Sequence, residues 1–269
     1  MSKPFIKWLG GKRQLMEEIV SNFPETYNHY FEPFIGGGAV FFNVNNKQCY
    51  INDKNSELIN VYCVIKKHPD ELIDSLEKHE ISKEYYYFLR ALDRTEEFKF
   101  LSPVKKASRF IYLNKLGYNG LYRVNSKGQY NVPYGKYKNP KIFDKDNIFL
   151  CSEKLNQTEI MNGDFEIIKP FIEENDFVYL DPPYFPLNKT SNFTSYTADG
   201  FGVDTNYRLK EFCDYLTTKK VKFLMSNSSS DFIIKLYEGY EIQLVKAKRN
   251  INSKADGRGR IDEVLIKNY

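Results

Sequence analysis

The chain has 269 residues, of which 42% are hydrophobic and 28% charged, and its formal net charge is +4. This ordinary composition fits one large α/β domain, or one domain that carries a sizeable insertion. A run of roughly 18 apolar residues and a signal-peptide core are both absent, so we expect neither a membrane span nor secretion. The 4 cysteines and 3 histidines are scattered. This argues against a disulfide scaffold and a zinc site, and it fits a reduced cytoplasm.

Residues 4–20 begin with an aromatic segment, followed by Gly10-Gly11-Lys12 and a helical pattern. Glycines and a lysine ahead of a helix can present N–H groups and a cation to an anionic ligand. The glycine spacing of a Walker A loop is missing. An anion-binding loop and a structural turn therefore both remain open. The expected apolar face of the helix consists of Leu15, Ile19 and Val20.

Residues 30–43 predict a short strand, the glycines Gly36–Gly38 and the start of an apolar helix, and a second strand then ends at Asp53. Rossmann-type domains use this order to hold an adenosine, with the acid accepting hydrogen bonds from the ribose hydroxyls. Phe41 occupies the third glycine position of the dehydrogenase fingerprint. This favours an adenosine-containing cofactor other than a nicotinamide. Alternatively, Asp53 is a helix N-terminal acid, with Asn55 or Ser56 available as the cap.

Charge divides residues 55–145 into two parts. The first part, to residue 100, has helical periodicity and an acidic excess, which predicts a solvated helical exterior with apolar positions such as Phe88. The part from residue 103 to 145 has many lysines and arginines, a single acid, and a predicted hairpin tip at residues 125–128. Its interleaved aromatics are Phe110, Tyr112, Tyr118, Tyr122, Tyr130, Tyr134, Tyr137 and Phe143. Cations neutralise phosphates and exposed aromatics stack on bases, so we favour nucleic-acid contact over a basic solvated loop.

An α/β rhythm resumes after residue 145. We expect strands at 148–150, 160–161, 177–180 and 221–225, helices at 165–174, 205–218 and 231–237, and closing strands at 240–246 and 261–267, plausibly antiparallel to each other. Residues 185–203 predict a lid or substrate loop. The basic segment 247–260 predicts phosphate contacts or disorder in the free protein.

The apolar strand 177–180 is followed by Asp181-Pro182-Pro183-Tyr184. Prolines cannot donate to a sheet ladder, so the strand must end there. Asp181 and Tyr184 are thereby held at the carboxyl end of a strand, where open α/β sheets bind their ligands. A surface turn with a capping acid is the alternative for this segment.

Together these motifs resemble those of the Dam-type (D12 class) DNA adenine-N6 methyltransferases. The resemblance rests on FIKWLGGK, FEPFIGGGAVF, the acid in NDKN, LGYNGLYRVNSKGQYNVPYGKYK and YLDPPYFPLNKTSNFTSY, and it covers nearly the whole chain. It implies a Rossmann-like S-adenosylmethionine-dependent methyltransferase fold with an inserted, mainly helical DNA-recognition module. The implied divisions are a first catalytic part at 1–56, a target-recognition module at 57–145 and a second catalytic part at 146–269.

The resemblance also implies site residues. The catalytic residues would be Asp181, Pro182 and Tyr184. The residues around S-adenosylmethionine would be Trp8, Lys12, Phe34, Gly36, Gly38, Asp53, Asp164, Phe165 and Asp181. The DNA-reading residues would be Lys7, Tyr118, Asn119, Leu121, Arg123, Pro133 and Tyr137. Lys12 would lie near the methionine carboxylate, Arg123 and Lys7 would read guanines of duplex GATC, and Tyr118 would fill the gap left by a flipped adenine. The sequence departs from some relatives at Tyr122-Arg123-Val124, where those relatives have other neighbours beside the arginine.

The chemistry suits these residue types. An exocyclic aromatic amine is a weak nucleophile, and acceptors at Asp181 and the Pro182 carbonyl can aim its lone pair at a sulfonium methyl group. A carboxylate at its ordinary pKa suffices, and no metal is implied. The expected setting is a bacterial or phage-encoded cytoplasmic enzyme, for which a cognate restriction endonuclease would be a natural companion. The alternatives are another DNA or RNA target, a protein glutamine substrate, an inactive DNA-binding homologue and, least favoured, a nicotinamide dehydrogenase.

Overall fold

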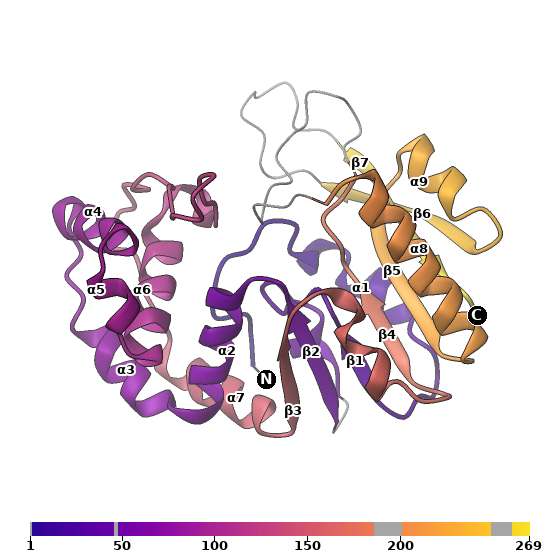
Figure 1. The fold of residues 1–269 in the computed structure, drawn as a ribbon, viewed down its shortest axis with the longest axis horizontal. Helices are drawn as coiled ribbons and strands as arrows, with labels where there is room; N and C mark the ends of the chain where they lie inside the picture. The colour runs from indigo at the N-terminus through magenta and orange to yellow at the C-terminus, as the bar shows by residue number, and fades with distance from the viewer. Residues whose placement is uncertain (1, 46–47, 186–200, 249–259) are drawn as a thin grey trace. The chain divides into compact units, whose positions relative to one another are not determined.

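The structure is a computed structural model that describes residues 2–45, 48–185, 201–248 and 260–269. Contacts group the chain into two compact units. The first contains Met1–Gly11 and Ile35–Asp164, and the second contains Lys12–Phe34 and the described residues that follow Asp164. Each unit has its own strands and core (Figure 1).

In the first unit, β2 (Cys49–Asp53) and β3 (Thr158–Asn162) pair in parallel, with Ile51 opposite Ile160. The helix α2 (Ser56–Lys67) follows β2 directly, and α7 (Lys145–Asn156) precedes β3. The Asn55 side chain caps α2 by accepting a hydrogen bond from the backbone N–H of Leu58 at 3.1 Å. Because the strands are parallel, Asp53 and Asn162 end them at the same edge.

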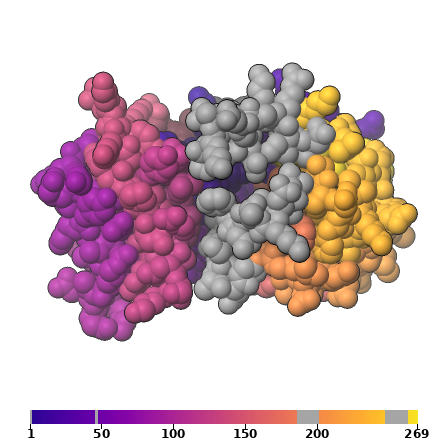
Figure 2. Space-filling model, turned by 90° about the horizontal axis from the view of Figure 1, so that it is seen from above, coloured from indigo at the N-terminus to yellow at the C-terminus, as the bar shows by residue number. Residues whose placement is uncertain are grey.

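The rest of the first unit is helical. Its elements are α3 (Pro69–Glu77), α4 (Lys83–Ala91), η3 (Leu92–Arg94), α5 (Glu97–Phe100), α6 (Pro103–Leu116) and η4 (Tyr118–Gly120). Most of α6 is buried, from Ala107 to Asn114 without a break, which makes it the central helix of this group. Residues 118–137 follow it as an irregular segment at the end of α6 (Figure 1). In the space-filling view, residues 100–145 and 70–100 form one continuous surface, coloured pink and purple (Figure 2).

The second unit has five strands in the order β1-β4-β5-β7-β6. They are β1 (Tyr30–Glu32), β4 (Phe177–Leu180), β5 (Lys222–Ser228), β7 (Arg260–Lys267) and β6 (Glu241–Lys248). The first three run in parallel, and β7 lies antiparallel between β5 and β6. The remaining elements are η1 (Lys12–Gln14), α1 (Met16–Ser21), η5 (Phe165–Phe171), α8 (Val203–Thr218) and α9 (Asp231–Leu236). Every residue of β4 is buried, as its apolar sequence predicts.

Several sequence predictions are confirmed by these elements. The hairpin tip forms at residues 125–128, where Val124 bridges to Tyr130. The last two strands pair antiparallel, and the strand that precedes Asp181 ends at Leu180. The predicted lid, which includes residues 186–200, and most of the basic segment 247–260 lie outside the described residues.

Other predictions were wrong for identifiable reasons. Residues 148–150 are helical in α7, because Asp144 caps that helix and its buried positions Ile148, Cys151 and Leu155 follow helical spacing. The segment predicted as a helix at 165–174 is a shorter 3₁₀ helix that contains Pro170, which cannot donate a backbone hydrogen bond. The helix expected after the glycines is a single 3₁₀ turn, Phe41–Asn43. Val20 and Phe88, expected to be apolar-face residues, are exposed.

No helix in the described part of the chain is both long enough and apolar enough to cross a bilayer.

Candidate active site

The glycine loop of the first unit is tied to the end of β2 through Asp53. One Asp53 oxygen accepts a hydrogen bond from the Gly36 backbone N–H at 3.0 Å, and the other accepts from the Asn55 N–H at 2.9 Å. Desolvation raises the pKa of Asp53, and these backbone hydrogen bonds partly oppose the rise. A carboxylate has about four acceptor positions, so Asp53 retains capacity for a ligand hydroxyl.

The glycines are required by their neighbours as well as by their backbone. Gly36 and Gly38 have φ values of +45° and +70°, which favour glycine. A Cβ at Gly36 would lie 2.7 Å from the indole nitrogen of Trp8, and one at Gly38 would lie 2.7 Å from the Tyr62 hydroxyl. The same Tyr62 hydroxyl donates to the Gly36 carbonyl at 2.9 Å. The loop therefore packs so closely against Trp8 and Tyr62 that only glycine fits at these two positions.

The end of β3 lies beside the end of β2, which places the predicted residue Asp164 close to Asp53. The Asn162 side chain donates to the Asp53 carbonyl at 2.8 Å, and the Asn52 side chain donates to the Gly163 carbonyl at 3.1 Å. The structure thus brings together, within the first unit, the predicted cofactor residues Trp8, the loop glycines, Asp53 and Asp164. Phe34 and Phe165 belong to the second unit, where their ring centroids are 5.5 Å apart.

We expect Asp53→Ala to weaken cofactor binding about tenfold, because a hydrogen bond to a charged group contributes roughly 1.5–3 kcal/mol and part of this is offset by water. Isothermal titration with S-adenosylmethionine checks this. The matched control is Asp74→Ala, which removes an exposed acid from α3 of the same unit. Equal affinities for the two variants would remove Asp53 from the cofactor site.

In the second unit, the side chains of Asp181 and Tyr184 both contact the buried ammonium group of Lys12. Lys12, which is 5% exposed, places its Nζ 2.8 Å from Asp181 Oδ1 and 4.7 Å from the centre of the Tyr184 ring. The loop Gly10–Lys12 was predicted to be an anion-binding loop or a turn, and in the structure its lysine forms an ion pair with the acid that follows β4. The Pro182 residue between these side chains is buried.

The expectation of an ordinary pKa at Asp181 was wrong. Desolvation raises the pKa of Asp181 to about 6, although the neighbouring Lys12 lowers it and Glu263 adds to the rise. The Asp181 side chain is 22% exposed, so it remains reachable from solvent. The carboxyl is ionised near neutral pH and becomes protonated in mildly acidic solution.

The predicted DNA-reading residues form one contact network in the first unit. The Lys7 ammonium lies 4.2 Å from the centre of the Tyr137 ring, and the Asn114 side chain donates to the backbone carbonyls of Lys7 and Gly120. The Tyr118 N–H donates to the Pro133 carbonyl at 2.8 Å. Asn119 has a φ of +55°, which turns the chain sharply beside the exposed ring of Tyr118, and Leu121 follows this turn half-buried.

Arg123 is exposed on the hairpin and is oriented by its partner strand. Its Nε donates to the Asn131 side chain at 2.6 Å, and its Nη2 donates to the Asn131 carbonyl at 3.4 Å. The guanidinium of Arg123 is therefore oriented by Asn131 of its own hairpin.

Two interpretations of the basic segment need correction. Four of the aromatics expected to stack on bases are core residues, namely Phe110, Tyr112, Tyr122 and Tyr130, and Tyr118 is highly exposed. Trp8 stacks on Tyr122 at 5.7 Å and on Phe110 at 6.5 Å between ring centroids. Arg109, counted among the surface cations, is 2% exposed. Its guanidinium lies 2.8 Å from Asp93 and 3.8 Å from Glu57.

The sequence analysis missed three supporting residues. Asn114 joins Lys7 to Gly120, Asp93 joins Arg109 to the hairpin, and Glu263 accepts a hydrogen bond from Tyr184 at 2.6 Å. Glu263 had one available signal: it directly precedes the apolar run Val264–Ile266 of an expected strand.

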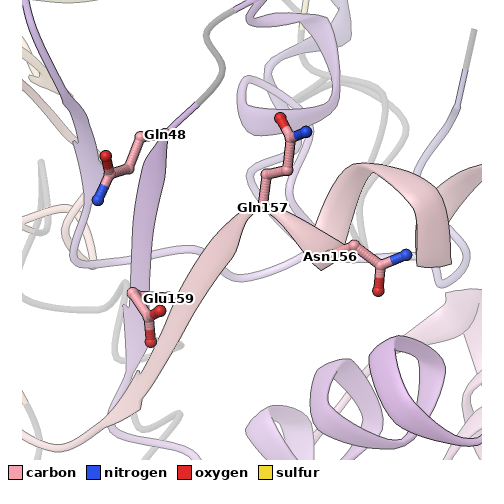
Figure 3. Close-up of a pocket in the computed structure, with 4 residues that line it drawn as sticks. All are labelled: Gln48, Asn156, Gln157 and Glu159. Atoms are coloured by element: carbon pink, nitrogen blue, oxygen red, sulfur yellow. The ribbon is translucent and has the colours of Figure 1, made fainter.

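An open hollow of about 420 Å³ lies elsewhere in the first unit (Figure 3). Its lining residues are Gln48, Asn156, Gln157 and Glu159. These residues sit where β2 and β3 begin, whereas the ligands of parallel sheets bind where strands end. The hollow therefore has no part in the site. Within the described residues, no cluster of three or more His, Cys, Asp or Glu side chains could hold a metal ion.

A glycine loop and an acid at the carboxyl ends of parallel strands define an α/β enzyme that binds a nucleoside-type cofactor. Residues 8–251 match the D12 class of N6 adenine-specific DNA methyltransferases. A type II methyltransferase of Lactococcus lactis subsp. cremoris is 49% identical, covering 99% of this chain and 95% of that protein. A type II methyltransferase of Methanocaldococcus jannaschii is 46% identical, covering 99% of each. The DNA adenine methylase of Escherichia coli (strain K12) is 33% identical, covering 98% and 94%.

The chain therefore belongs to the D12 class of N6 adenine-specific DNA methyltransferases, which have a Rossmann-like fold. S-adenosylmethionine is the methyl donor. The first unit fits this cofactor, because Asp53 stands at the carboxyl end of a parallel strand and keeps capacity to accept a hydrogen bond from a ligand hydroxyl. The expectation of an adenosine-containing cofactor other than a nicotinamide is thereby confirmed.

Proposed function

We propose that this enzyme methylates N6 of the adenine in duplex GATC, after that base has left the helical stack. The observation that carries the proposal is the pairing of Asp181 with Lys12 directly after β4, beside Tyr184. Enzymes that modify a base within a duplex extrude it and hold it against aromatic side chains. Tyr184 would provide that surface, and Tyr118 would occupy the space left in the duplex.

Asp181 would orient the reacting amine. Lys12 contacts Oδ1, so we assign Oδ2 and the Pro182 carbonyl as acceptors for the two amino hydrogens. S-adenosylmethionine supplies an electrophilic methyl group on a sulfonium sulfur. With the amine held by two acceptors, its lone pair would be aimed at the methyl group that the bound cofactor would supply for in-line transfer. The surplus proton then leaves the methylated nitrogen, and a carboxylate with a pKa of about 6 can accept it.

The remaining assigned residues divide by task. The cofactor residues that we assign are Trp8, Gly36, Gly38, Asp53 and Asp164 in the first unit, and Lys12, Phe34, Phe165 and Asp181 in the second. Residues 57–145 would form the target-recognition module, with Lys7, Tyr118, Asn119, Leu121, Arg123, Pro133 and Tyr137 against DNA. Such an enzyme would work in the cytoplasm of a bacterial cell, where its DNA lies. Two relatives are type II methyltransferases, so we further propose a cognate restriction endonuclease as its companion.

The decisive experiment incubates the protein with methyl-labelled S-adenosylmethionine and plasmid DNA. The plasmid is then digested with two endonucleases that cut GATC but differ in their sensitivity to its methylation. We expect label in DNA and protection from the sensitive endonuclease only. Label without protection would reject GATC as the target and leave the reaction intact. Transfer to RNA in place of DNA would reject the duplex substrate.

We expect Arg123→Ala to relax base preference and to reduce discrimination by roughly 1–3 kcal/mol, as the loss of one bidentate base contact does. Competition between GATC and singly substituted duplexes measures the change. Lys127→Ala is the matched control, since it removes an exposed cation from the tip of the same hairpin. A uniform loss of affinity in both variants, with discrimination unchanged, would make Arg123 a phosphate contact.

A further inference from the structure

We propose that Glu263 is a positioning residue for methyl transfer, which holds the Tyr184 ring in place from β7, the strand that lies next to β5 on the side away from β4. The Tyr184 hydroxyl donates to Glu263 Oε2 at 2.6 Å. A hydrogen bond of this length to a carboxylate is of the strong, charge-assisted kind. This inference rests on the proposed roles of Asp181 and Tyr184.

Glu263 is a rigid anchor because its strand is paired on both sides. It lies opposite Ser228 of β5 and Val245 of β6. The next two residues of β7, Val264 and Leu265, are almost completely buried. Central strands with buried side chains are among the last elements of a protein to unfold locally. A side chain on such a strand, like that of Glu263, therefore stays in a fixed position.

The segment that follows Asp181 makes a second contact with the sheet, at the residue of β5 that lies opposite Glu263. Ser228, opposite Glu263, donates its hydroxyl to the Phe185 carbonyl at 2.8 Å. Tyr184 and Phe185 are thus held one after the other, through a side chain and through the backbone. This matters because the chain leaves the strand at two prolines, which supply no backbone donors of their own.

Lys12 completes the restraint on the ring. Its ammonium lies 4.7 Å from the centre of the Tyr184 ring, while Glu263 holds the hydroxyl at the ring edge. The hydrogen bond fixes the position of the hydroxyl, and the ammonium packs against the ring, so the two contacts together restrain where the ring lies. The proposed adenine would then meet a stacking surface of fixed orientation, and its amino group would fall at a fixed distance from Asp181.

Glu263 also acts on Asp181 through its charge. The charged and titratable groups around Asp181 are Lys12, Glu263, Tyr179 and Tyr184. Burial and the nearby carboxylates raise the pKa of the Tyr184 hydroxyl well above its usual range, so it stays a donor. Glu263 raises the pKa of Asp181, and Lys12 lowers it. Removing the Glu263 charge should therefore lower the pKa of Asp181.

Two substitutions at Glu263 separate its effect on the position of Tyr184 from the effect of its charge on Asp181. Glu263→Gln keeps an oxygen that accepts from Tyr184 and removes the charge, whereas Glu263→Ala removes both. We expect Glu263→Ala to lower kcat by about 10- to 100-fold, with the KM for S-adenosylmethionine changed less than threefold, since small misplacements of reacting groups carry such losses. We expect Glu263→Gln to keep kcat within about threefold at pH 8 and to move the acidic limb of its pH profile to lower pH.

Together with Glu263→Ala, the variants Tyr184→Phe and Tyr184→Phe/Glu263→Ala form a double-mutant cycle. If Glu263 acts through the Tyr184 hydroxyl, the double variant loses no more activity than the single ones. Glu238→Gln, an exposed carboxylate of the same unit, is the control and should behave as the parent.

Wild-type kcat in Glu263→Ala, or fully additive losses in the cycle, would overturn the inference. If Glu263→Ala fails to fold in a thermal melt, Glu263→Gln and Tyr184→Phe decide: an unmoved pH limb with a normal kcat in Tyr184→Phe would overturn it. Activity in Asp181→Ala would instead reject the proposed site, so the two failures can be told apart.

Discussion

Asp181→Ala should reduce kcat by at least about 10³-fold while leaving DNA affinity nearly unchanged. Removing one oriented hydrogen-bond partner of a reacting group lowers kcat by about 10²–10³, and here the substitution also removes the carboxylate that pairs with the Lys12 ammonium at 2.8 Å. Without that negative charge, the ammonium would oppose the positive charge that develops on the attacking nitrogen. Single-turnover transfer of labelled methyl groups, with a gel-shift titration alongside, measures both quantities.

Asp181→Asn is the informative companion, because the amide keeps the shape and one acceptor oxygen but cannot carry the charge. We expect an intermediate loss that no longer depends on pH around 6. In the parent enzyme, the pKa of Asp181 is raised to about 6. The ionised acceptor is therefore present above this value, and kcat should fall as the pH drops through it. A parent profile that stays flat between pH 5 and 8, within the range where the fold is intact, would contradict this role.

The strand-end acids could be predicted from sequence because their signal is local. An apolar run that stops at Asp53, or at Asp181 with two prolines behind it, fixes both the strand and the place where it ends. The glycine loop is equally local. A three-residue apolar run such as 148–150 carries no such signal, since it is equally compatible with a strand and a buried helix turn.

The partners of these residues could not be predicted, because they are remote in sequence. Lys12 meets Asp181, and Glu263 meets Tyr184, only through the folding of the sheet. Arg109 was counted among the surface cations, but it is buried. A count of charges does not show which way a side chain points on a buried helix. The residues to which we assign the chemistry were therefore visible in the sequence, while the residues that contact and orient them required the structure.

The hairpin that carries Arg123 is held by such an orienting group, centred on Asp93. Its Oδ2 accepts a hydrogen bond from the Tyr130 N–H at 2.8 Å and lies 2.8 Å from the Arg109 guanidinium. Its Oδ1 accepts from Arg94, whose other nitrogen donates to the Tyr130 carbonyl. The Asp93 side chain is 8% exposed and that of Arg109 is 3% exposed. One buried carboxylate thus connects the central helix α6 with the strand opposite Arg123.

We expect Asp93→Ala to lower the free energy of unfolding by about 3–5 kcal/mol, since removing one partner of a buried ion pair leaves an uncompensated charge. Urea unfolding followed by tyrosine and tryptophan fluorescence measures it. Asp93→Asn retains acceptor capacity and should lose less. The control Glu96→Ala, at an 81% exposed side chain three residues away, should change stability by no more than about 0.5 kcal/mol. Because Asp93 joins α6 to the hairpin and lies far from the strand-end acids in sequence, surviving Asp93→Asn protein should lose base discrimination more than kcat. Unchanged discrimination together with unchanged stability would mean that the hairpin is held by its own residues, with Asn131 sufficient to orient Arg123.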